Sequence, residues 1–192
     1  MPLLVKGSVM RRLLFMCLAT SLLVLLGGCT KRTNVSVTRD ACSLISNQEI
    51  ESVQNSPVKE AKSTEHLDGT FRVLQCLYTA AEFSKSVSLA LVRSDPKQGS
   101  ARSPKDFWKE KFDPYEDEEP KTNSGDEKEK GSAPKKIEGL GDDAYWVGNR
   151  FGGMLYVLKG DAFISIGVGG TDDQQTKLKK SKALAQKALQ RL

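Results

Sequence analysis

Few side chains in this 192-residue sequence are of the types that carry out catalysis, and they are not grouped. The single histidine, His66, lies in a polar stretch that supplies no nucleophile with its base and no metal cluster. Asp142 and Asp143 form the one candidate carboxylate pair, close to Tyr145 and Trp146. Because adjacent residues at the start of a strand point to opposite sides, we interpret this pair as part of a turn. We therefore expect no enzymatic activity.

An acidic run and a glycine-rich stretch are further candidates for chemistry. The run Glu116 to Glu119 lacks the spaced carboxylates and the central glycine of a calcium loop. Gly167, Gly169 and Gly170 are not followed by the Lys-Ser/Thr spacing of a phosphate-binding loop. We interpret the acidic run as solvated and the glycines as a strand end, and we expect no metal and no cofactor.

The apolar run near the N-terminus predicts where the protein is delivered. Arg11 and Arg12 precede residues 13–26, which are apolar except for two hydroxyl residues, and two glycines then lead into Cys29. A positive start, a short apolar core and a small-residue exit are typical of a secretory signal peptide. A membrane-spanning helix needs about 20 apolar residues, more than this run contains. The interpretation is the same whether the chain starts at Met1 or at Met10.

The end of this run, Leu26-Gly27-Gly28-Cys29, resembles the lipobox of bacterial lipoproteins. The resemblance implies that residues 1–28 are a signal peptide and that Cys29 receives a diacylglycerol. Two or three acyl chains hold a protein stably in a membrane, since each buried CH₂ contributes about 0.8 kcal/mol. Residue 30 is Thr, not the Asp that tends to retain such proteins at the inner membrane. We therefore expect the outer membrane, facing the periplasm, in a Gram-negative host and otherwise the outer face of the cell membrane.

A plainly secreted protein in which Cys29 is incidental is the alternative to this lipid anchor. In either case, removal of residues 1–28 leaves 164 residues, enough for one domain with a genuine core. The 164 residues contain 26 Lys and Arg against 24 Asp and Glu, a net charge of +2. This balance, with no basic patch interleaved with aromatic residues, argues against a nucleic-acid partner.

The four cysteines can be sorted once the lipobox is accepted. Cys17 would leave with the signal peptide and Cys29 would carry the lipid, so Cys42 and Cys76 remain as a pair in an oxidising compartment. We predict a disulfide between them, which closes a loop of about 35 residues and stabilises the fold by roughly 3 to 4 kcal/mol. A metal or redox pair is the competing interpretation, but the short spacing and histidine partners of such sites are missing.

Local signals predict three helices and five strands. Ser46 and Glu49 form a capping box, and Ser103 with Pro104 begins a second helix. The glycine of Lys159-Gly160-Asp161 predicts a tight hairpin. The helices are expected at about 47–54, 103–112 and 173–191, and the strands at about 71–80, 86–93, 144–147, 154–158 and 162–168.

Three stretches are expected to lack regular structure. Residues 29–39 are polar and predict a tether, and residues 58–69 predict a polar connection that contains His66. Residues 115–136 are dense in charged residues, Gly, Ser and Pro, a composition that predicts a mobile insertion. The expected fold is therefore α+β, in one domain of residues 40–192: an antiparallel sheet of about five strands with packed helices, including a long C-terminal helix.

The C-terminal helix is amphipathic, with Thr171 or Asp172 as its expected cap. The face expected to pack on the sheet carries Leu178, Ser181, Ala185, Ala188, Leu189 and Leu192. The basic residues expected largely off this face are Lys177, Lys180, Lys187 and Arg191. We interpret the basic side as solvated; the alternative is that it rests on anionic lipid headgroups or on a cell-wall polymer.

Four short motifs resemble a set that recurs in small, uncharacterised bacterial envelope lipoproteins. They are CSLIS-x-x-EI at 42–50, QC-x-Y at 75–78, GLGD-x-AYW at 139–146 and V-x-KG at 157–160. The set covers most of the mature chain, and its layout is similar to that of PsbP-like α/β sandwich proteins. The resemblance implies an antiparallel sheet with helices packed on it, and it carries over no catalytic residue.

Two functions remain open from the sequence. The first is a non-catalytic, lipid-anchored envelope protein, an interaction or accessory module whose partner is an envelope protein or the cell wall. The alternative is a periplasmic carrier of a small apolar ligand, with a cleft lined by Trp108, Tyr145, Trp146 and Tyr156. Aromatic residues at such spacing are also typical of a packed core. The oligomeric state is left open.

Overall fold

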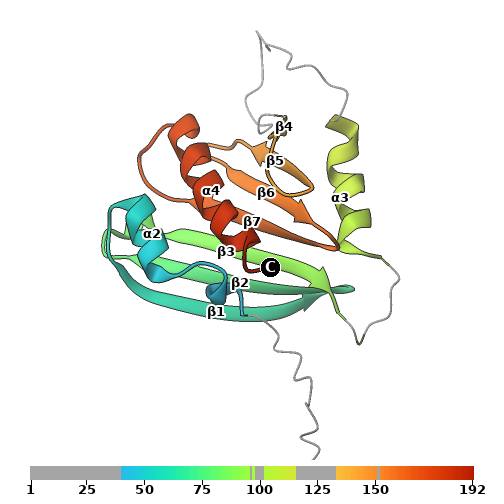
Figure 1. The fold of residues 1–192 in the computed structure, drawn as a ribbon, viewed down its shortest axis with the longest axis horizontal. Coiled ribbons are helices and arrows are strands. Elements are labelled where there is room, and N and C mark those ends of the chain that lie inside the picture. Colours follow the sequence, from blue (N-terminus) through green and yellow to red (C-terminus); the bar gives the residue numbers. More distant parts are fainter. Residues whose placement is uncertain (1–39, 96, 98–101, 116–132, 151) are drawn as a thin grey trace, which may run out of the picture. The chain divides into compact units, whose positions relative to one another are not determined.

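Seven strands form one antiparallel sheet in the part of the chain that the structure describes (Figure 1). This computed structural model describes residues 40–95, 97, 102–115, 133–150 and 152–192. The predicted signal peptide, the tether and Cys29 therefore lie outside the described residues, as does most of the predicted insertion at 115–136. Among the described helices, none is long and apolar enough to cross a membrane.

The strands lie side by side in the order β1-β2-β3-β7-β6-β5-β4, and each neighbouring pair is antiparallel. Their bounds are β1 Val58–Asp68, β2 Phe71–Ala80, β3 Val87–Ser94, β4 Lys135–Lys136, β5 Asp143–Val147, β6 Met154–Lys159 and β7 Ala162–Val168. The helices are α2 Asn47–Gln54, α3 Pro104–Phe112 and α4 Gln174–Leu189, with 3-10 turns η1 Ala41–Ser43, η2 Phe83–Lys85 and η3 Asp113–Tyr115.

The α+β class is confirmed, but the sheet has two more strands than the five expected. The predicted polar connection at 58–69 is in fact β1, which pairs with β2 along its length. Val58 is half-buried and the other ten residues of β1 are exposed, so the strand shows no alternation of apolar and polar residues. Its strand conformation comes from the backbone ladder with β2. The second missed strand, β4, is two residues long and lies at the end of the predicted insertion.

The predicted capping residues are confirmed at two of the three helix starts. Ser46 and Ser103 each accept a hydrogen bond from the backbone N–H three residues on, and the acidic residues there, Glu49 and Asp106, accept one in return. Helix α4 is capped by Asp173, not by Thr171 or Asp172 as predicted. The β6–β7 hairpin is confirmed, with Gly160 in the left-handed region at φ 60°.

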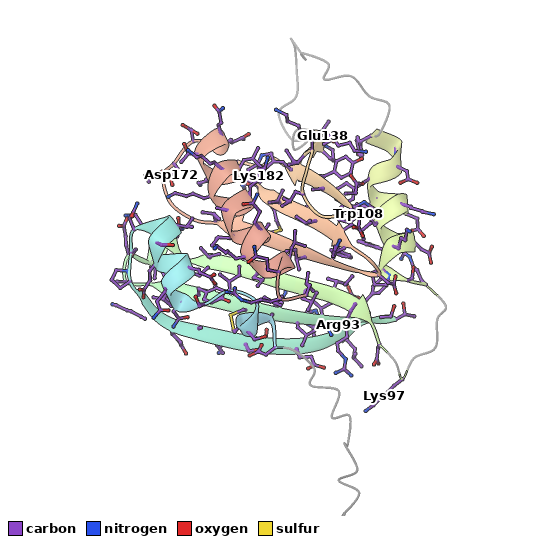
Figure 2. The ribbon with its side chains drawn as sticks, viewed as in Figure 1. Arg93, Lys97, Trp108, Glu138, Asp172 and Lys182 are labelled. Atoms are coloured by element: carbon purple, nitrogen blue, oxygen red, sulfur yellow. A yellow bond between two sulfur atoms is a disulfide. The ribbon has the colours of Figure 1, made fainter. Side chains whose placement is uncertain are left out.

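The two faces of the sheet are covered by different helices. Phe163 and Ile164 are neighbours in β7, yet they belong to two separate apolar clusters, because strand residues alternate between faces. The larger cluster packs η1, α2 and α4 on one face, and α2 and α4 lie over the near face in Figure 1. Of the described helices, only α3 packs on the other face, and its Trp108 lies against β5 (Figure 2).

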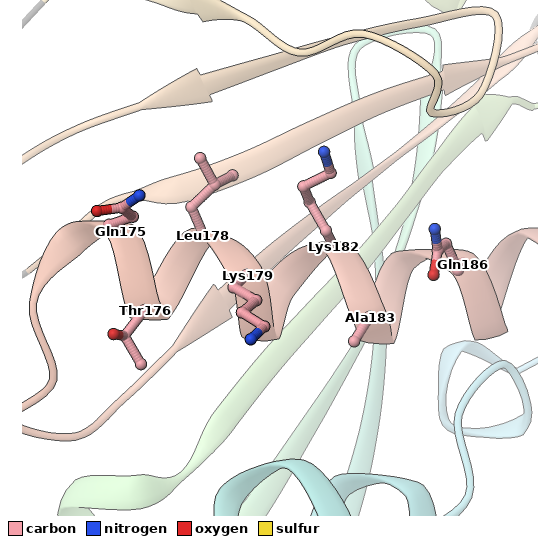
Figure 3. A pocket seen from close by; sticks show the side chains of 7 residues that line it. All are labelled: Gln175, Thr176, Leu178, Lys179, Lys182, Ala183 and Gln186. Atoms are coloured by element: carbon pink, nitrogen blue, oxygen red, sulfur yellow. The ribbon is translucent and has the colours of Figure 1, made fainter.

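Helix α4 buries three of the six residues predicted for its sheet-facing side, Ser181, Ala185 and Ala188, and two more, Leu178 and Leu189, pack half-buried against the same cluster. Its buried residues are Lys177, Ser181, Leu184, Ala185 and Ala188, whereas Leu192 is 37% exposed. The stem of Lys177 fits beneath Gly152, where a Cβ would stand 2.5 Å from Lys177 Cδ. Lys177 is therefore buried against a glycine 25 positions away, which the helical period alone does not reveal. The outward side of α4 carries Gln175, Lys179, Lys182 and Gln186 (Figure 3).

The disulfide is present: Cys42 in η1 and Cys76 in β2 are bonded, with their Cα atoms 5.0 Å apart. We expect the double variant Cys42→Ala with Cys76→Ala to lower the free energy of unfolding by about 3 to 4 kcal/mol, because an open chain regains loop entropy. Urea unfolding measures this change. A reductant should shift the native protein to the same midpoint and leave the variant unmoved. Equal midpoints for variant and native protein would contradict the prediction.

Candidate functional site

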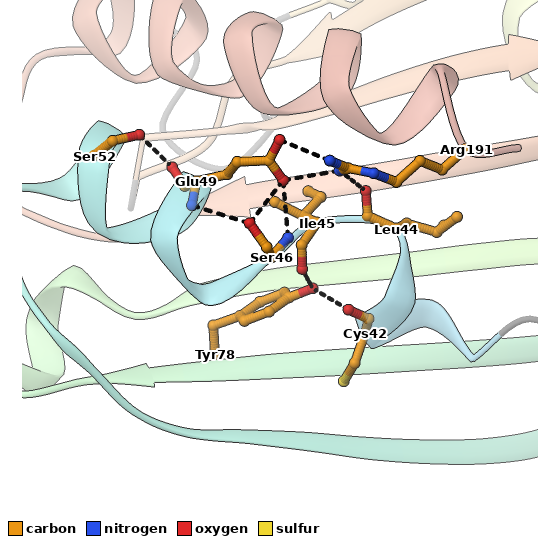
Figure 4. A network of polar contacts seen from close by, with 8 residues as sticks. All are labelled: Cys42, Leu44, Ile45, Ser46, Glu49, Ser52, Tyr78 and Arg191. Atoms are coloured by element: carbon orange, nitrogen blue, oxygen red, sulfur yellow. Dashed lines mark hydrogen bonds and ion pairs between the residues drawn. The ribbon is translucent and has the colours of Figure 1, made fainter.

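The first described residues of the domain, from Asp40 on, are held to the sheet and to the residues after α4 by a set of contacts that we call the N-terminal clamp (Figure 4). Its covalent part is the bond between Cys42 and Cys76. Tyr78, two residues along the same face of β2, donates its hydroxyl to the carbonyl oxygens of Ile45 at 2.7 Å and of Cys42 at 3.2 Å. Ser63 of β1 donates to the carboxylate of Asp40. The clamp therefore begins at residue 40.

The C-terminal end of the chain completes the clamp. Arg191 donates from both terminal nitrogens to the two carboxylate oxygens of Glu49, each at 2.8 Å, and from Nη1 to the carbonyl oxygen of Leu44 at 2.8 Å. Hydrogen bonds from Arg191, together with those from Ser46, lower the pKa of Glu49 to about 2. Glu49 thus serves twice, as the capping-box acceptor of α2 and as the partner of Arg191.

Tyr78 is held as a neutral donor in this clamp. Its side chain is fully buried, and burial raises the pKa of its hydroxyl to about 12, with the nearby charge of Asp40 acting in the same direction. A hydroxyl so far from ionisation donates to carbonyl oxygens and does not act as a base. The clamp is therefore structural, although it gathers several titratable groups.

The candidate catalytic residues of the sequence have structural roles or stand apart. His66 lies on β1, all but one of whose residues are exposed. Asp142 accepts from the backbone N–H of Gly160 at 2.6 Å, which lowers the pKa of its carboxyl, and it also binds Lys159. Asp143 accepts from Trp108 Nε1 and from its neighbour's backbone N–H, each at 2.9 Å. Within the described ranges, no group of three or more His, Cys, Asp or Glu could hold a metal ion.

The four aromatic residues predicted to line one cleft are divided between the two faces of the sheet. Trp108, Tyr145 and Tyr156 lie together in the cluster beneath α3, and the centres of the Trp108 and Tyr145 rings are 6.0 Å apart. Trp146 points to the opposite face and packs in the larger core under α4. These four side chains therefore form no common wall, and three of them are buried as core.

The face that carries α3 is covered over only part of its area. Beyond α3, this face contains a hollow that we call the sheet trough. Polar and apolar side chains from β1, β2, β3, β6 and β7 line it. Its lining side chains are Lys62, Thr64, Gln75, Leu77, Ser88, Ala90, Met154 and Ser165. The hollow has a volume of about 520 Å³. Small residues on the central strands make the floor, and longer residues on the flanking strands make the walls.

The register of the strands explains why the trough is hollow. Ala90 of β3 pairs with Ser165 of β7, and Ser88 pairs with Gly167, so four small residues meet at the centre of the face. A Cβ on Gly167 would stand 2.8 Å from Ser88 Oγ. Leu77 stands on the β2 side and is 43% exposed. The trough is thus an open surface with an apolar component.

A second hollow, the aromatic hollow, adjoins the trough where the N-terminal end of α3 meets the sheet. It has a volume of about 380 Å³ and is lined by Phe71, Val73, Val92, Phe107 and Phe163, with Asp68, Gly69, Thr70 and Arg102 at its margin. The guanidinium of Arg102 lies 5.0 Å from the centre of the Phe107 ring. Sequence reasoning missed these residues because they come from separate elements. For the neighbouring sheet trough a signal was available in the sequence: the small residues Ser86, Ser88 and Ala90 alternate with apolar residues and predict an exposed side of β3.

The Glu49–Arg191 contact gives the stability of the domain a specific pH dependence. Because folding lowers the pKa of Glu49, its contribution is present above pH 4.5 and is lost as the pH falls toward 2. Arg191 is 39% exposed, so solvent screens the pair and we expect Glu49→Gln to cost about 1 kcal/mol at neutral pH. Near pH 2 the variant and the native protein should unfold at closely similar urea concentrations. The exposed Glu60→Gln is the control, and a pH-independent deficit in Glu49→Gln would refute the assignment.

Comparisons with known proteins add no constraint on function. No protein-family model, no curated protein and no solved structure matches this chain. The resemblance of its motifs to envelope lipoproteins therefore stays a prediction from the sequence. Any indication of function therefore comes from the clamp, the sheet trough and the aromatic hollow.

Proposed function

We propose that this chain is a non-catalytic, lipid-anchored protein of the bacterial envelope and that its domain is an interaction or accessory module. The lipobox that ends at Cys29 supports the anchor. Asp142 binds the backbone of the β6–β7 hairpin, and Asp143 binds Trp108. These two carboxylates, the candidate acid and base, therefore have structural partners, which supports a module without catalysis.

The observation that carries the proposal is the unequal covering of the sheet. One face is closed by η1, α2 and α4, whereas the sheet trough leaves Leu77, Ser88 and Ala90 open beside α3. Exposed apolar surface rimmed by polar residues is typical of an interaction site. The trough is open to solvent and spans five strands, so it suits the surface of an envelope partner better than an enclosed small molecule.

The N-terminal clamp supports the same assignment. An anchored domain is connected to its lipid through the residues that precede Asp40, and the clamp ties residues 40–49 to β1, β2 and the end of α4. Tension from the anchor would act first on η1, which a covalent bond holds at Cys42. This arrangement suits a domain that is attached at its N-terminal end.

A carrier of a small apolar ligand is the second candidate, and the aromatic hollow is the observation that favours it. Phe71, Phe107 and Phe163 offer an apolar lining, and Arg102, which is ion-paired with Glu110, stands at the margin. The cleft predicted from Trp108, Tyr145, Trp146 and Tyr156 is not part of this candidate, because those residues do not share a face.

The anchor is tested by the mass of the mature protein. We expect protein purified from bacterial membranes to begin at Cys29 and to carry the mass of a diacylglycerol, with or without a further acyl chain. The variant Cys29→Ser should lack this mass, because a hydroxyl does not replace the thiol that receives the lipid. Native protein of unmodified mass, released in soluble form, would end the lipoprotein proposal.

The trough is tested by crosslinking in intact cells. A photoreactive amino acid in place of Leu77 should capture one discrete envelope component, because this side chain is exposed at the wall of the trough. Adding Ala90→Arg should abolish the capture by filling the floor, whereas Gln186→Arg, which adds the same charge on α4, should leave it intact. Capture that persists in the Ala90→Arg background would count against the trough.

A further inference from the structure

Positive charge in this protein is concentrated at its two ends. Residues 174–192 contain six Lys and Arg and no Asp or Glu, whereas residues 40–173 contain 17 Lys and Arg against 24 Asp and Glu. Residues 30–39, which follow the predicted lipid-bearing cysteine, contain three Lys and Arg and no acid. The domain as a whole is therefore close to neutral, but α4 and the segment beside the predicted anchor are both strongly basic.

Three of the six basic residues at 174–192 are used within the fold. Lys177 is buried, Lys180 donates to Asp172 at 2.7 Å and to Gln54 at 3.2 Å, and Arg191 binds Glu49. These residues account for the side of α4 that faces the sheet and α2. Their charges are unavailable to a partner.

The other three are directed outward. Lys179 and Lys187 are exposed and Lys182 is half-buried, and among the described residues no carboxylate lies within ion-pair distance of these three. In Figure 3 Lys179 and Ala183 point to one side of α4 and Lys182 and Leu178 to the other, and the half-buried Leu178 packs against the larger apolar cluster. The exposed part of α4 thus presents three ammonium groups, and the helix itself carries no Asp or Glu.

We propose that this outward side of α4 docks on the anionic lipid headgroups of the membrane in which the protein is anchored. The proposal rests on the proposed lipid anchor and names the surface that the domain turns toward the membrane. Ten residues separate Cys29 from Asp40, and even fully extended they span at most about 36 Å. The domain therefore stays within reach of the headgroups, and its charge distribution selects the side that meets them.

The energetics favour docking only when several lysines act together. Each Lys near an anionic membrane surface contributes roughly a fivefold gain in partitioning, so three give about a hundredfold. The interaction falls off within a Debye length, about 10 Å at 0.1 M salt and about 3 Å at 1 M. Docking of this kind is reversible and salt-sensitive, in contrast to the acyl anchor. It leaves the sheet trough, which lies on the opposite face of the sheet from α4, open to a partner.

The test uses the acylated protein reconstituted into vesicles of phosphatidylcholine alone or mixed with phosphatidylglycerol. The variant Gln186→Cys places a thiol on the outward side of α4, and this is the one free thiol once Cys29 is acylated and Cys42 is bonded to Cys76. A fluorophore on this thiol should be protected from aqueous acrylamide, an uncharged quencher, in phosphatidylglycerol vesicles and quenched in phosphatidylcholine vesicles. High salt should abolish the protection.

Charge variants make the result specific. Neutralising the three outward lysines with Lys179→Gln, Lys182→Gln and Lys187→Gln should lower the ratio of docked to undocked molecules roughly a hundredfold. The matched triple variant Lys59→Gln, Lys105→Gln and Lys109→Gln removes the same charge from exposed positions elsewhere and should leave docking unchanged. Equal quenching in the two kinds of vesicle, or equal loss in the two triple variants, would overturn the proposal.

Different measurements test the lipid anchor and the docking of α4, so the failure of one proposal can be told from the failure of the other. Flotation with phosphatidylcholine vesicles reports the acyl chains alone, because these vesicles carry no net charge. Protein that does not float with them lacks the proposed anchor. Protein that floats with both kinds of vesicle but shows no difference in acrylamide quenching has its anchor, and the α4 proposal is then the one that is wrong.

Discussion

The bond between Cys42 and Cys76 joins the turn η1 to the second strand of the sheet, and much of the remaining structure depends on it. Once η1 is fixed, Tyr78 can donate to the carbonyl oxygens of Cys42 and Ile45, and α2 begins where its capping box meets Arg191. The disulfide holds the turn that directly precedes α2, so it also supports the contact that α2 makes with α4 at the other end of the domain sequence. A short helix such as α2 would be marginal without such tertiary support.

This constraint also explains why the two faces of the sheet differ. The clamp gathers η1, α2 and α4 on one face, where they bury the larger apolar cluster. The other face receives only α3 among the described helices, and α3 brings its own aromatic residues to one part of that face. The central strands carry Ser88, Ala90 and Ser165 beyond α3, so the uncovered part is hollow and polar enough to face water. A domain with one closed face and one open face suits a tethered module that presents a surface.

The parts of the fold that local chemistry determines were predictable from the sequence, and the parts that depend on distant neighbours were not. The boxes at Ser46 and Ser103 and the glycine turn at 160 lie within a few residues of what they cap or bend, so their signals are complete in the sequence. Strand β1 has no buried side to produce a pattern, and it exists because β2 offers it a ladder. The predicted aromatic cleft failed because Tyr145 and Trp146 are neighbours in a strand, and adjacent strand residues cannot line one wall.

The central claim is that the open part of the sheet is covered by a partner in the native envelope. Hydroxyl-radical footprinting with mass spectrometry measures this directly, by comparing side-chain oxidation in isolated envelopes and in purified protein. Leu77 is 43% exposed at the wall of the trough, and Phe83, 75% exposed in η2, lies outside the trough. The account predicts that Leu77 and Met154 are protected in envelopes while Phe83 is oxidised equally in both samples. Equal oxidation of all three residues in both samples would contradict it.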